Sequence, residues 1–587
     1  MTPGMARIPI RASGSARRAA VVLLATTTIF SAWSCTPDAV TEGPSTEIGR
    51  YGGQLVSTLR AETKTLNPIL AINQESRTVI DRLNADLIHI NQLTHEVEPA
   101  LAESWEMSTD GRTFELHLRR GVLFSDGEPF DADDVVFTFQ VHLDEGVASA
   151  QRDLLMPEGS PVLIEKIDSH TVRVTLEKAL AVGDRIFDLI GILPEHLLRT
   201  AYDNNTLTQV WGIDTSPEEI AGLGPFRLRE FRPGDRVILE RNPHYWKKDS
   251  DGNALPYLDE LVFLFLPSDD AQVLSFQSGD SHVIDTPSAE NYAVLERAGA
   301  DFEMRDAGPS MRRELFVFNM NDLSERNLPE IVDRQRWFRA REFRRAIAKA
   351  IDLEGIINLV YQGRASAMPS NVSPGNKRWL NESIPKPARD LEQARTLLRG
   401  AGFRWDGADH LLDPDGNRVS FSIMVASSNS NRMKTAAILE QDFVDLGIEI
   451  EIRPVDQPTL LKRLLDTLEY DTALIALGSG DPDPNPQIPL LKSSGRLHLW
   501  NTNESEPLSD WQREIDTLMD AQLIELDFST RKQLYDRVQE IMFENQPIIC
   551  LVSVNILTGA SRRVGNFKPA LLQHYTLWND YELFLKE

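Results

Sequence analysis

The sequence predicts a mixed α/β protein, and three observations support this fold class. The chain has 587 residues, too many for one hydrophobic core, so about two or three domains are expected. Residues 99–139 alternate apolar and polar positions on both sides of an Asp110-Gly111 turn. They then change to a helical apolar spacing, which indicates a β-hairpin followed by a helix. Residues 421–453 follow the order strand, helix, strand, which predicts a parallel sheet covered by helices.

The composition is that of a soluble globular protein with a large negative charge. Apolar residues make up 41% of the chain and charged residues 25%, which are ordinary proportions. The formal net charge of −27 at pH 7 argues against binding to nucleic acid or to anionic membrane surfaces. The same charge does not by itself identify a cationic ligand, because acidity also keeps a protein soluble.

Residues 1–34 differ in composition from the rest of the chain and are expected to be a signal peptide. They combine several arginines, no acidic residue and an apolar run at residues 19–30, which is typical of a secretory signal. The apolar run is shorter than a membrane span requires. Residues 31–35 resemble a bacterial lipobox, so Cys35 is the expected lipid attachment site, with ordinary cleavage nearby as the alternative. Residues 35–49 contain proline, glycine and several polar residues and are expected to form the lipidated tether.

Three stretches of the chain carry a resemblance to a known family. They are residues 99–139, 222–246 and 315–374. In the first, the matching elements are Trp105, the turn Asp110-Gly111, the strand pair Phe114 through Phe130 and the helix start Ala132 through Val135. On these motifs, and over about residues 50–587, the chain resembles the family 5 extracellular solute-binding proteins. These are the dipeptide- and oligopeptide-binding components of ABC importers.

The resemblance implies a two-lobed periplasmic-binding-protein architecture, type II-like, with an extra subdomain inserted in the first lobe. Lobe I is expected to comprise residues 50–92, 211–317 and the returning segment 546–587. The inserted subdomain is expected at residues 93–210 and lobe II at residues 318–545. The chain would cross between the lobes near Asn319 and Pro547. These crossings would act as a hinge, and the lobes would close on a ligand held between them.

A glycine-rich acidic loop follows the strand predicted at residues 471–477. The carboxyl ends of strands are where open α/β sheets bind ligands. In peptide-binding members of the family, an aspartate in this loop pairs with the α-ammonium group of the ligand. In this chain, Gly478 occupies that position. Asp481 and Asp483 are the possible substitutes, and the alternative is that they cap the following turn.

Other ligand-binding residues are implied by the resemblance alone. The family places backbone of the cleft edge and a proline-containing loop beside the ligand. Trp500 is predicted either as a cleft aromatic residue or as part of the core. The full set of expected ligand-binding residues is Ile72, Asn73, Gln74, Asn371, Gly478, Ser479, Asp481, Asp483 and Trp500.

No motif in the sequence requires catalysis or a cofactor. The H-E-x-x-H, G-x-S-x-G and Walker patterns are absent, and so is any cysteine and histidine spacing typical of a metal site. Asp249, Asp251, Asn253 and Glu260 match ligand positions of an EF-hand. However, Ala254 replaces the required glycine, so a solvated turn is predicted instead. We therefore expect no catalytic residue, no cofactor and no metal.

The resemblance implies a binding protein that captures a small peptide and delivers it to the permease and ATPase subunits of an ABC importer. It implies a monomer in the periplasm or cell envelope, attached to the membrane by its lipid anchor. Within the family, the alternative solutes are a nickel chelate, an oligosaccharide or an opine. From other classes, the alternatives are a secreted hydrolase and a lipoprotein chaperone.

Overall fold

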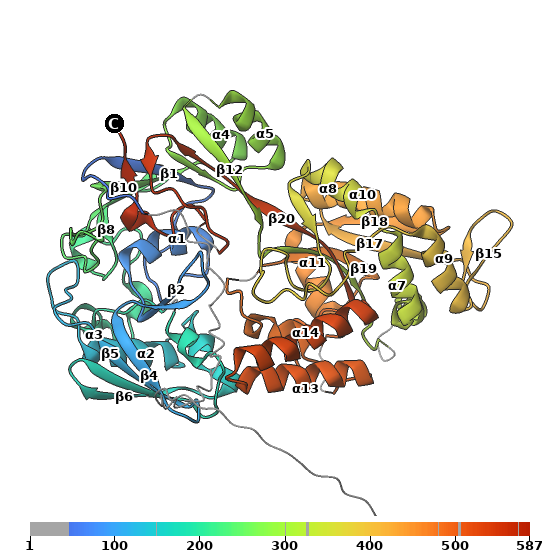
Figure 1. Cartoon of the computed structure of the whole chain (residues 1–587), viewed down its shortest axis with the longest axis horizontal. Coiled ribbons are helices and arrows are strands. Elements are labelled where there is room, and N and C mark those ends of the chain that lie inside the picture. Colours follow the sequence, from blue (N-terminus) through green and yellow to red (C-terminus); the bar gives the residue numbers. More distant parts are fainter. Residues whose placement is uncertain are drawn as a thin grey trace, which may run out of the picture. The chain divides into compact units, whose positions relative to one another are not determined.

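The computed structural model describes residues 46–587 except 148, 189, 300, 324–327, 479, 503–505 and 573–574. The chain separates into residues 1–45 and a compact unit of residues 46–587, which contains the elements described here (Figure 1). The predicted signal peptide and Cys35 lie outside the described residues. Within the described part of the chain, no helix combines the length and the apolar character that crossing a bilayer demands.

The first sheet has four strands in the order β1-β10-β9-β8. It consists of β1 (Gln54–Leu59), β8 (Phe226–Arg232), β9 (Arg236–Arg241) and β10 (Glu260–Phe265). β1 pairs with β10 in parallel, and the other pairs are antiparallel. The predicted hairpin around Gly234 forms, and this glycine adopts a φ of 72° in the turn. Apolar side chains of this sheet pack with α1 (Gln74–Leu83) and with the end of the chain in one core.

A second four-stranded sheet, β4-β5-β7-β6, belongs to the predicted inserted subdomain. It consists of β4 (Ala102–Met107), β5 (Thr113–Leu118), β6 (Leu163–Asp168) and β7 (Thr171–Thr175). The predicted hairpin and helix at residues 99–139 are confirmed. α2 (Ala132–Leu143) begins with a capping box, because the Asp131 side chain accepts a bond from the Asp133 amide and the Asp134 side chain from the Asp131 amide. Short elements nearby are β2 (Ile88–Ile90), β3 (Val97–Pro99), the 3-10 helix η3 (Gly183–Phe187) and α3 (Glu195–Asp203).

The largest sheet has eight strands, with the main order β11-β20-β13-β19-β17-β18 and with β12 and β14 also pairing with β20. Its strands are β11 (Val283–Asp285), β12 (Phe302–Pro309), β13 (Arg313–Phe318), β14 (Ala365–Ala367), β17 (Ser420–Ala426), β18 (Glu449–Val455), β19 (Thr472–Leu477) and β20 (Ile548–Ser561). β17 pairs in parallel with β18 and β19, and α10 (Ser430–Val444) connects β17 to β18. The predicted parallel, helix-covered sheet is therefore confirmed for this part, while β13 and β20 add antiparallel pairs.

The remaining helices and strands complete the fold. The helices are α4 (Asp269–Ser278), α5 (Ala289–Ala298), α6 (Pro329–Arg339), α7 (Arg341–Ala350), α8 (Leu353–Tyr361), α9 (Leu391–Gly400), α11 (Gln457–Lys462), α12 (Ile488–Leu491), α13 (Asp510–Ile524) and α14 (Phe528–Asn545). The short strands are β15 (Arg404–Trp405), β16 (Leu411–Leu412), β21 (Val564–Gly565) and β22 (Phe584–Leu585). Most of these helices pack on the large sheet and enclose one extensive core.

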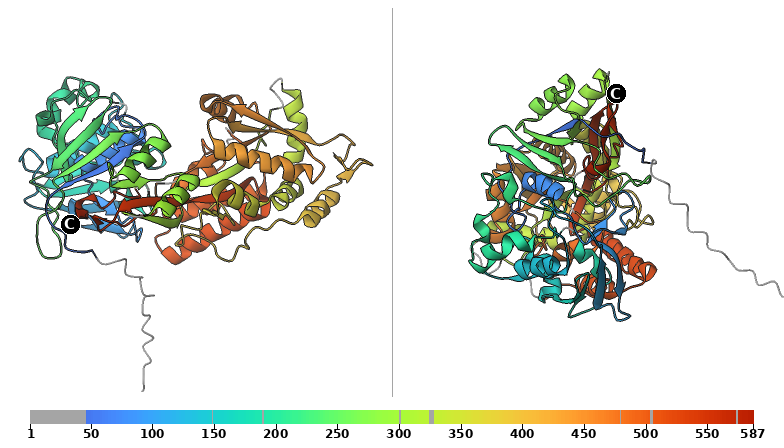
Figure 2. Two further views of the ribbon diagram at one scale, coloured as in Figure 1. Left: turned by 90° about the horizontal axis from the view of Figure 1, so that it is seen from above. Right: turned by 90° about the vertical axis from the view of Figure 1, so that its left-hand side faces the viewer.

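The long strand β20 joins two parts of the large sheet (Figure 2). Its first half pairs with β13 and β14, and its second half, from Asn555 onward, pairs with β11 and β12. The Ser310 amide donates to the Val554 carbonyl, and the Ser310 carbonyl accepts from Ser553 Oγ at 2.7 Å. The crossing between the two parts therefore lies at these residues. Asn319, near which the sequence predicts a crossing between lobes, follows β13, is buried and donates to the Leu468 and Tyr470 carbonyls.

Candidate functional site

The loop after β19 places both of its predicted acidic residues against arginines of the same chain. Asp483 forms a two-pronged ion pair with Arg531 of α14, with Nη1–Oδ2 at 2.6 Å and Nη2–Oδ1 at 2.8 Å. Asp481 pairs with Arg185 of η3, whose Nη1 lies 2.5 Å from Oδ1. Charge-assisted bonds of this geometry are stronger than neutral ones. In this structure, a ligand ammonium group would have to compete with a guanidinium for either carboxylate.

The same two side chains also shape the loop. Asp481 Oδ1 accepts a bond from the Asp483 amide at 2.9 Å, and Asp483 Oδ1 accepts one from the Asn485 amide at 3.0 Å. These are the turn-capping contacts that were the alternative interpretation of the sequence. Burial raises the pKa of the Asp481 carboxyl, and Arg185 opposes the shift. Gly478, which was expected near the ligand, is exposed at the start of the loop, and Ser479 lies outside the described residues.

Arg185 connects two segments of the protein that are far apart in sequence. Its Nη1 binds Asp481, and its Nη2 donates to the carbonyl of His95 at 2.9 Å. The guanidinium is therefore held between the predicted inserted subdomain and the loop of predicted lobe II. Asn376 Nδ2 adds a bond of 2.7 Å to the carbonyl of Pro482, in the same loop. The sequence did not indicate Arg185, because an ion pair between distant segments leaves no local pattern.

Asn371 and Trp500, both predicted near the ligand, are buried in this structure. Asn371 is 2% exposed, and its Nδ2 donates to Gln487 Oε1 at 3.0 Å and to Tyr535 Oη at 3.1 Å. These bonds fix the proline-containing loop to α14 and to the segment after the acidic loop. The Trp500 side chain is fully buried in the core of the large sheet, with its ring centroid 4.0 Å from that of His498. Of the two alternatives for Trp500, this structure shows the core position.

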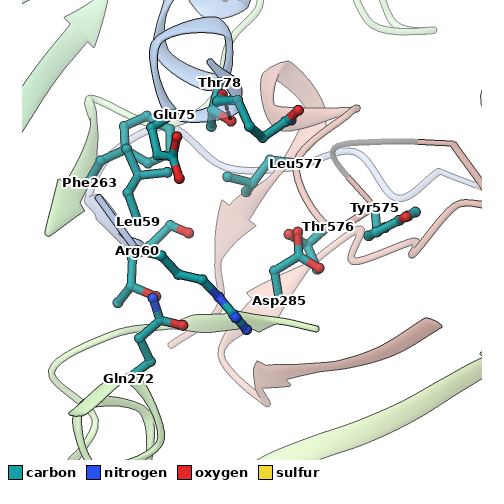
Figure 3. A pocket seen from close by; sticks show the side chains of 13 residues that line it. Leu59, Arg60, Glu75, Thr78, Phe263, Gln272, Asp285, Tyr575, Thr576 and Leu577 are labelled. Atoms are coloured by element: carbon teal, nitrogen blue, oxygen red, sulfur yellow. Dashed lines mark hydrogen bonds between the residues drawn. The ribbon is translucent and has the colours of Figure 1, made fainter. Parts of the chain in front are cut away.

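The predicted cleft edge lies beside a separate hollow of about 210 Å³ in the first sheet region (Figure 3). Ile72 is 83% exposed, Asn73 is the N-cap residue of α1, and Gln74 lines the hollow. Figure 3 shows Arg60, from the end of β1, and Asp285, from the end of β11, both pointing into this hollow. No hydrogen bond or ion pair between described residues joins Ile72, Asn73 or Gln74 to the acidic loop. Gln74 therefore lines a hollow whose lining includes none of the expected residues of the acidic loop.

The predicted calcium-like run forms a turn. Asp249 Oδ1 accepts bonds from the amides of Asp251 and Asn253, both at 2.9 Å, and Oδ2 accepts one from Tyr257 Oη at 2.7 Å. These bonds keep the pKa of Asp249 at about 2, although burial acts in the opposite direction. The turn that the sequence predicts is therefore present at these residues.

Residues 96–497 match a protein family described as bacterial extracellular solute-binding proteins, family 5 Middle. The match covers more than half of the chain. The chain belongs to this family. The family consists of substrate-binding proteins rather than enzymes. The word "extracellular" in the family's description indicates that its members act outside the cytoplasm. The predicted fold class is confirmed, because solved structures of the same architecture superimpose on the chain.

Three similar proteins illustrate the extent of the match. The family 5 chain is 27% identical over 542 residues to a protein of Deinococcus radiodurans named "Probable ABC transporter-binding protein", covering 87% of this chain and 89% of the relative. It is 25% identical over 522 residues to the oligopeptide-binding protein AppA of Bacillus subtilis, covering 86% and 87%. The crystal structure of the substrate-binding protein CtaP of Listeria monocytogenes gives a TM-score of 0.74 at 22% identity, covering 92% and 100%. The last comparison concerns the fold alone.

Asp285 of this family 5 protein lines the hollow of about 210 Å³ beside the predicted cleft edge. Its Oδ1 is covered and has no hydrogen-bond partner among the described residues. Burial raises its pKa to about 7, and the charge of Arg60 opposes this shift. Arg60 itself pairs with Asp269, with Nη1–Oδ1 at 3.0 Å. Asp285 is therefore poorly compensated when ionised.

We expect Asp285→Asn to stabilise the protein by about 1–3 kcal/mol at pH 8. The unfolded carboxyl ionises near pH 4 and the folded one near pH 7. The contribution of Asp285 to stability therefore falls as the pH rises through this window and is constant above it. Urea unfolding of both proteins at pH 4, 6 and 8 measures the effect. The difference should shrink towards pH 4, whereas the exposed control Asp251→Asn should give little difference at any pH. A pH-independent difference for Asp285→Asn would refute the assignment.

Proposed function

We propose that this protein is the extracytoplasmic binding component of an ABC importer and that it captures a small peptide between its two lobes. The observation that carries the proposal is the family match across residues 96–497. A relative that covers most of the chain, AppA, is named an oligopeptide-binding protein, which supports the peptide as solute. Peptide main chain can bind to strand edges irrespective of its side chains, and hydrated pockets can accept varied side chains.

The mechanism that we propose is closure of the lobes around the solute. Binding would shift an existing equilibrium between open and closed forms by as much as the solute prefers the closed form. The Arg185–Asp481 pair is a contact that such closure would make or exchange, because it joins the subdomain to the loop of lobe II. The closed form would then deliver the solute to the permease. ATP hydrolysis would occur on separate subunits, so no nucleotide site is needed here.

A second candidate is a solute without a free α-ammonium group, such as an opine, an oligosaccharide or a nickel chelate. The specific observation that favours it is the pairing of both loop carboxylates with arginines. The side chains of Asp483 and Arg531 are 2% and 3% exposed, so this pair is not accessible to a solute. Asp481 and Arg185 are 19% and 11% exposed, and Arg185 takes the place that an ammonium group would take.

The proposal includes the lobe boundaries and the cellular placement expected from the sequence. Lobe I would comprise residues 50–92, 211–317 and 546–587, with the subdomain at residues 93–210 and lobe II at residues 318–545. The protein would act as a monomer in the periplasm or cell envelope. A diacylglyceryl group on Cys35 would hold it at the membrane, and mass spectrometry of the mature protein would show whether this group is present.

We expect a peptide panel to stabilise the protein in a thermal-shift assay. A solute at about 100 times its Kd should add about 2.7 kcal/mol to the free energy of unfolding. The panel should contain di- to pentapeptides, the same peptides with acetylated amino termini, and representative opines, oligosaccharides and metal chelates. Mass spectrometry of the mixtures should recover every solute intact. A panel without any stabilising compound, or a solute that is hydrolysed, would contradict the proposal.

The variant Arg185→Ala distinguishes the two solute classes. It removes the guanidinium from Asp481, so the affinity for free peptides should rise about tenfold relative to that for the same acetylated peptides, because any effect of the variant on closure is common to both. Arg496→Ala is a matched control, because the Arg496 side chain is 90% exposed. If free and acetylated peptides respond equally to Arg185→Ala, the second candidate is favoured.

A further inference from the structure

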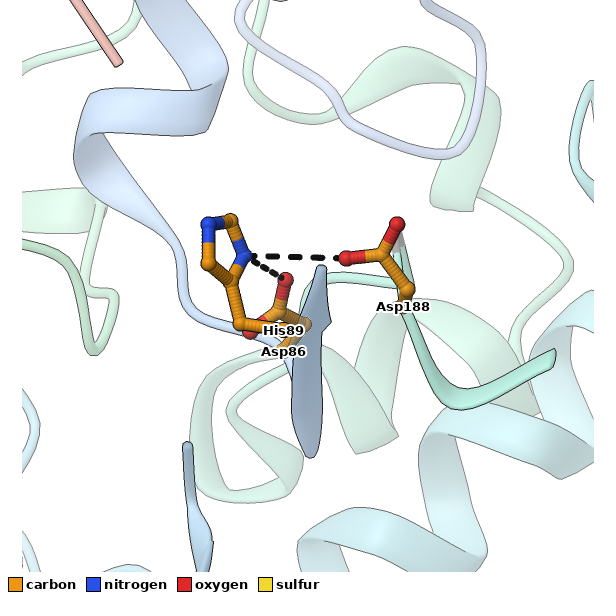
Figure 4. Close-up of side chains that lie close together, drawn as sticks. All are labelled: Asp86, His89 and Asp188. Carbon is orange, nitrogen blue, oxygen red and sulfur yellow. Dashed lines mark hydrogen bonds and ion pairs between the residues drawn. The ribbon is translucent and has the colours of Figure 1, made fainter. Parts of the chain in front are cut away.

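Two aspartates and a histidine from separate segments converge beside the predicted inserted subdomain (Figure 4). Asp86 precedes β2, His89 lies in β2, and Asp188 follows η3. His89 Nδ1 lies 3.1 Å from Asp86 Oδ2 and 3.6 Å from Asp188 Oδ1. Figure 4 shows the same ring nitrogen directed at both carboxylates. One donor atom of each residue therefore lies within 4.8 Å of the other two.

These distances match the edges of a metal coordination shell. A metal ion about 2.0–2.2 Å from each of three ligand atoms separates those atoms by about 3.0–3.5 Å. The distance of 3.1 Å between His89 Nδ1 and Asp86 Oδ2 lies within this range, and the distance of 3.6 Å to Asp188 Oδ1 lies just above it. The ligand oxygens of Asp86 and Asp188 lie within 4.8 Å of each other, so binding of an ion would draw the two carboxylates together. The side chain of Asp188 is 7% exposed, and the Ile90 amide donates to its Oδ1 at 3.3 Å, so the carboxylate is already oriented.

The two carboxylates of the cluster are not paired with a lysine or an arginine in the described part of the chain. In the part of the chain that the structure describes, neither Asp86 nor Asp188 has a lysine or arginine nitrogen within 4.0 Å. Lys247 acts on the cluster only from a greater distance, and its ammonium group lies over the rings of Trp246 and Tyr581.

An ion could reach the cluster from solvent. The side chains of His89 and Asp86 are 30% and 18% exposed, and both line a hollow of about 160 Å³ with Gln92 and Trp246. In this hollow, Gln92 Oε1 and Trp246 Nε1 have no hydrogen-bond partner among the described residues. Both atoms are suited to bond to water molecules that complete a coordination shell. The hollow therefore supplies an entry path and room for the remaining ligands.

We propose that Asp86, His89 and Asp188 form a binding site for one borderline divalent metal ion, such as Zn²⁺ or Co²⁺. The protein ligands are Asp86 Oδ2, His89 Nδ1 and Asp188 Oδ1, and water in the hollow completes the shell. One imidazole with two carboxylates suits this class of ion. Ca²⁺ is disfavoured, because it requires six to eight oxygen ligands. Sequence spacing did not predict the site, because Asp188 is distant in the chain from the other two ligands.

Titration with Co²⁺ tests the site on the full chain after treatment with EDTA and dialysis. We expect one equivalent of Co²⁺ to bind at pH 7, with visible ligand-field absorption, and Zn²⁺ to displace it. His89→Ala and Asp188→Asn should each weaken Co²⁺ binding by about 100-fold or more. Binding should also weaken at pH 5, where the ligands take up protons. Melting curves of the metal-free proteins show whether each variant is folded. If either variant is unfolded, Asp86→Asn replaces it in the measurement of Co²⁺ binding.

A matched control exists in the same region of the chain. His196 Nε2 lies 2.9 Å from Asp126 Oδ2, and among the residues that the structure describes it forms an ion pair with this one carboxylate. His196→Ala and Asp126→Asn should leave both the stoichiometry and the affinity for Co²⁺ unchanged. The proposal is overturned if the unmodified protein takes up no Co²⁺ at stoichiometric concentration. It is equally overturned if the His89 and Asp188 variants bind Co²⁺ as well as the unmodified protein does. Neither result would affect the proposed transport function, since peptide binding is measured separately.

Discussion

Replacing Arg531 by alanine is expected to lower the free energy of unfolding by about 3–5 kcal/mol. The variant leaves the Asp483 carboxylate in a site where it is 2% exposed, without the two bonds that Arg531 donates to it. Arg531 also donates from Nε to the Gln522 carbonyl at 2.8 Å, so a second buried acceptor loses its partner. Urea unfolding followed by circular dichroism measures the change.

The size of this effect depends on leaving one charge of a buried pair unpaired. The double variant Arg531→Met with Asp483→Leu should recover most of the lost stability, because it removes both charges. Arg537→Ala is the matched control on the same helix. The Arg537 side chain is 40% exposed, and its ion pairs should contribute within about 1 kcal/mol. Equal losses for Arg531→Ala and Arg537→Ala would show that the Asp483–Arg531 pair is not buried in solution.

Trp500→Ala is expected to destabilise the protein by about 3–5 kcal/mol and to leave the solute affinity of the folded protein unchanged. The Trp500 ring is fully buried and packs against His498 and Trp511, so its removal opens a cavity in the core. Urea unfolding measures the first quantity. Calorimetric titration with a solute from the panel measures the second, at a temperature where the variant is folded.

A residue in the ligand cleft would give the opposite pattern. If Trp500 contacted the solute, its truncation would reduce affinity strongly and stability only slightly. Trp500→Phe should lose less stability than Trp500→Ala, because it leaves a smaller cavity. Leu497→Ala is the control for a substitution in the same segment. The Leu497 side chain is 37% exposed, so the change should be within about 0.5 kcal/mol.

Local chemistry explains which elements of the fold were predictable. The hairpin at Asp110-Gly111 and the hairpin around Gly234 formed as predicted, because a turn that needs a positive φ specifies its own position. α2 was predictable in the same way, since Asp131 and Asp134 satisfy the first amides of the helix. The β-α-β order of residues 421–453 was sufficient to predict the parallel pairs of β17.

The candidate site was less predictable, because its contacts join segments that are distant in the sequence. The acidic loop itself was found from its composition and from its place after a buried strand. Its partners Arg185 and Arg531 were not, since a single arginine in a helix has many possible counterions. The burial of Trp500 was equally undetermined, because an aromatic residue near a strand suits both a core and a cleft. The cluster of Asp86, His89 and Asp188 depends in the same way on the fold bringing η3 to β2.

The pairing of β20 has a consequence for the lobe closure that we propose. A linker of loose chain would turn freely, and the parts on either side would have no preferred angle. β20 instead is hydrogen-bonded to neighbours on both sides of Val554 and Asn555, so turning one part against the other must twist a paired ladder. A paired strand of this kind resists twisting, and the angle that it favours between the two parts is set by the natural twist of the sheet. In the closure that we propose, opening and closing would be elastic departures from this angle.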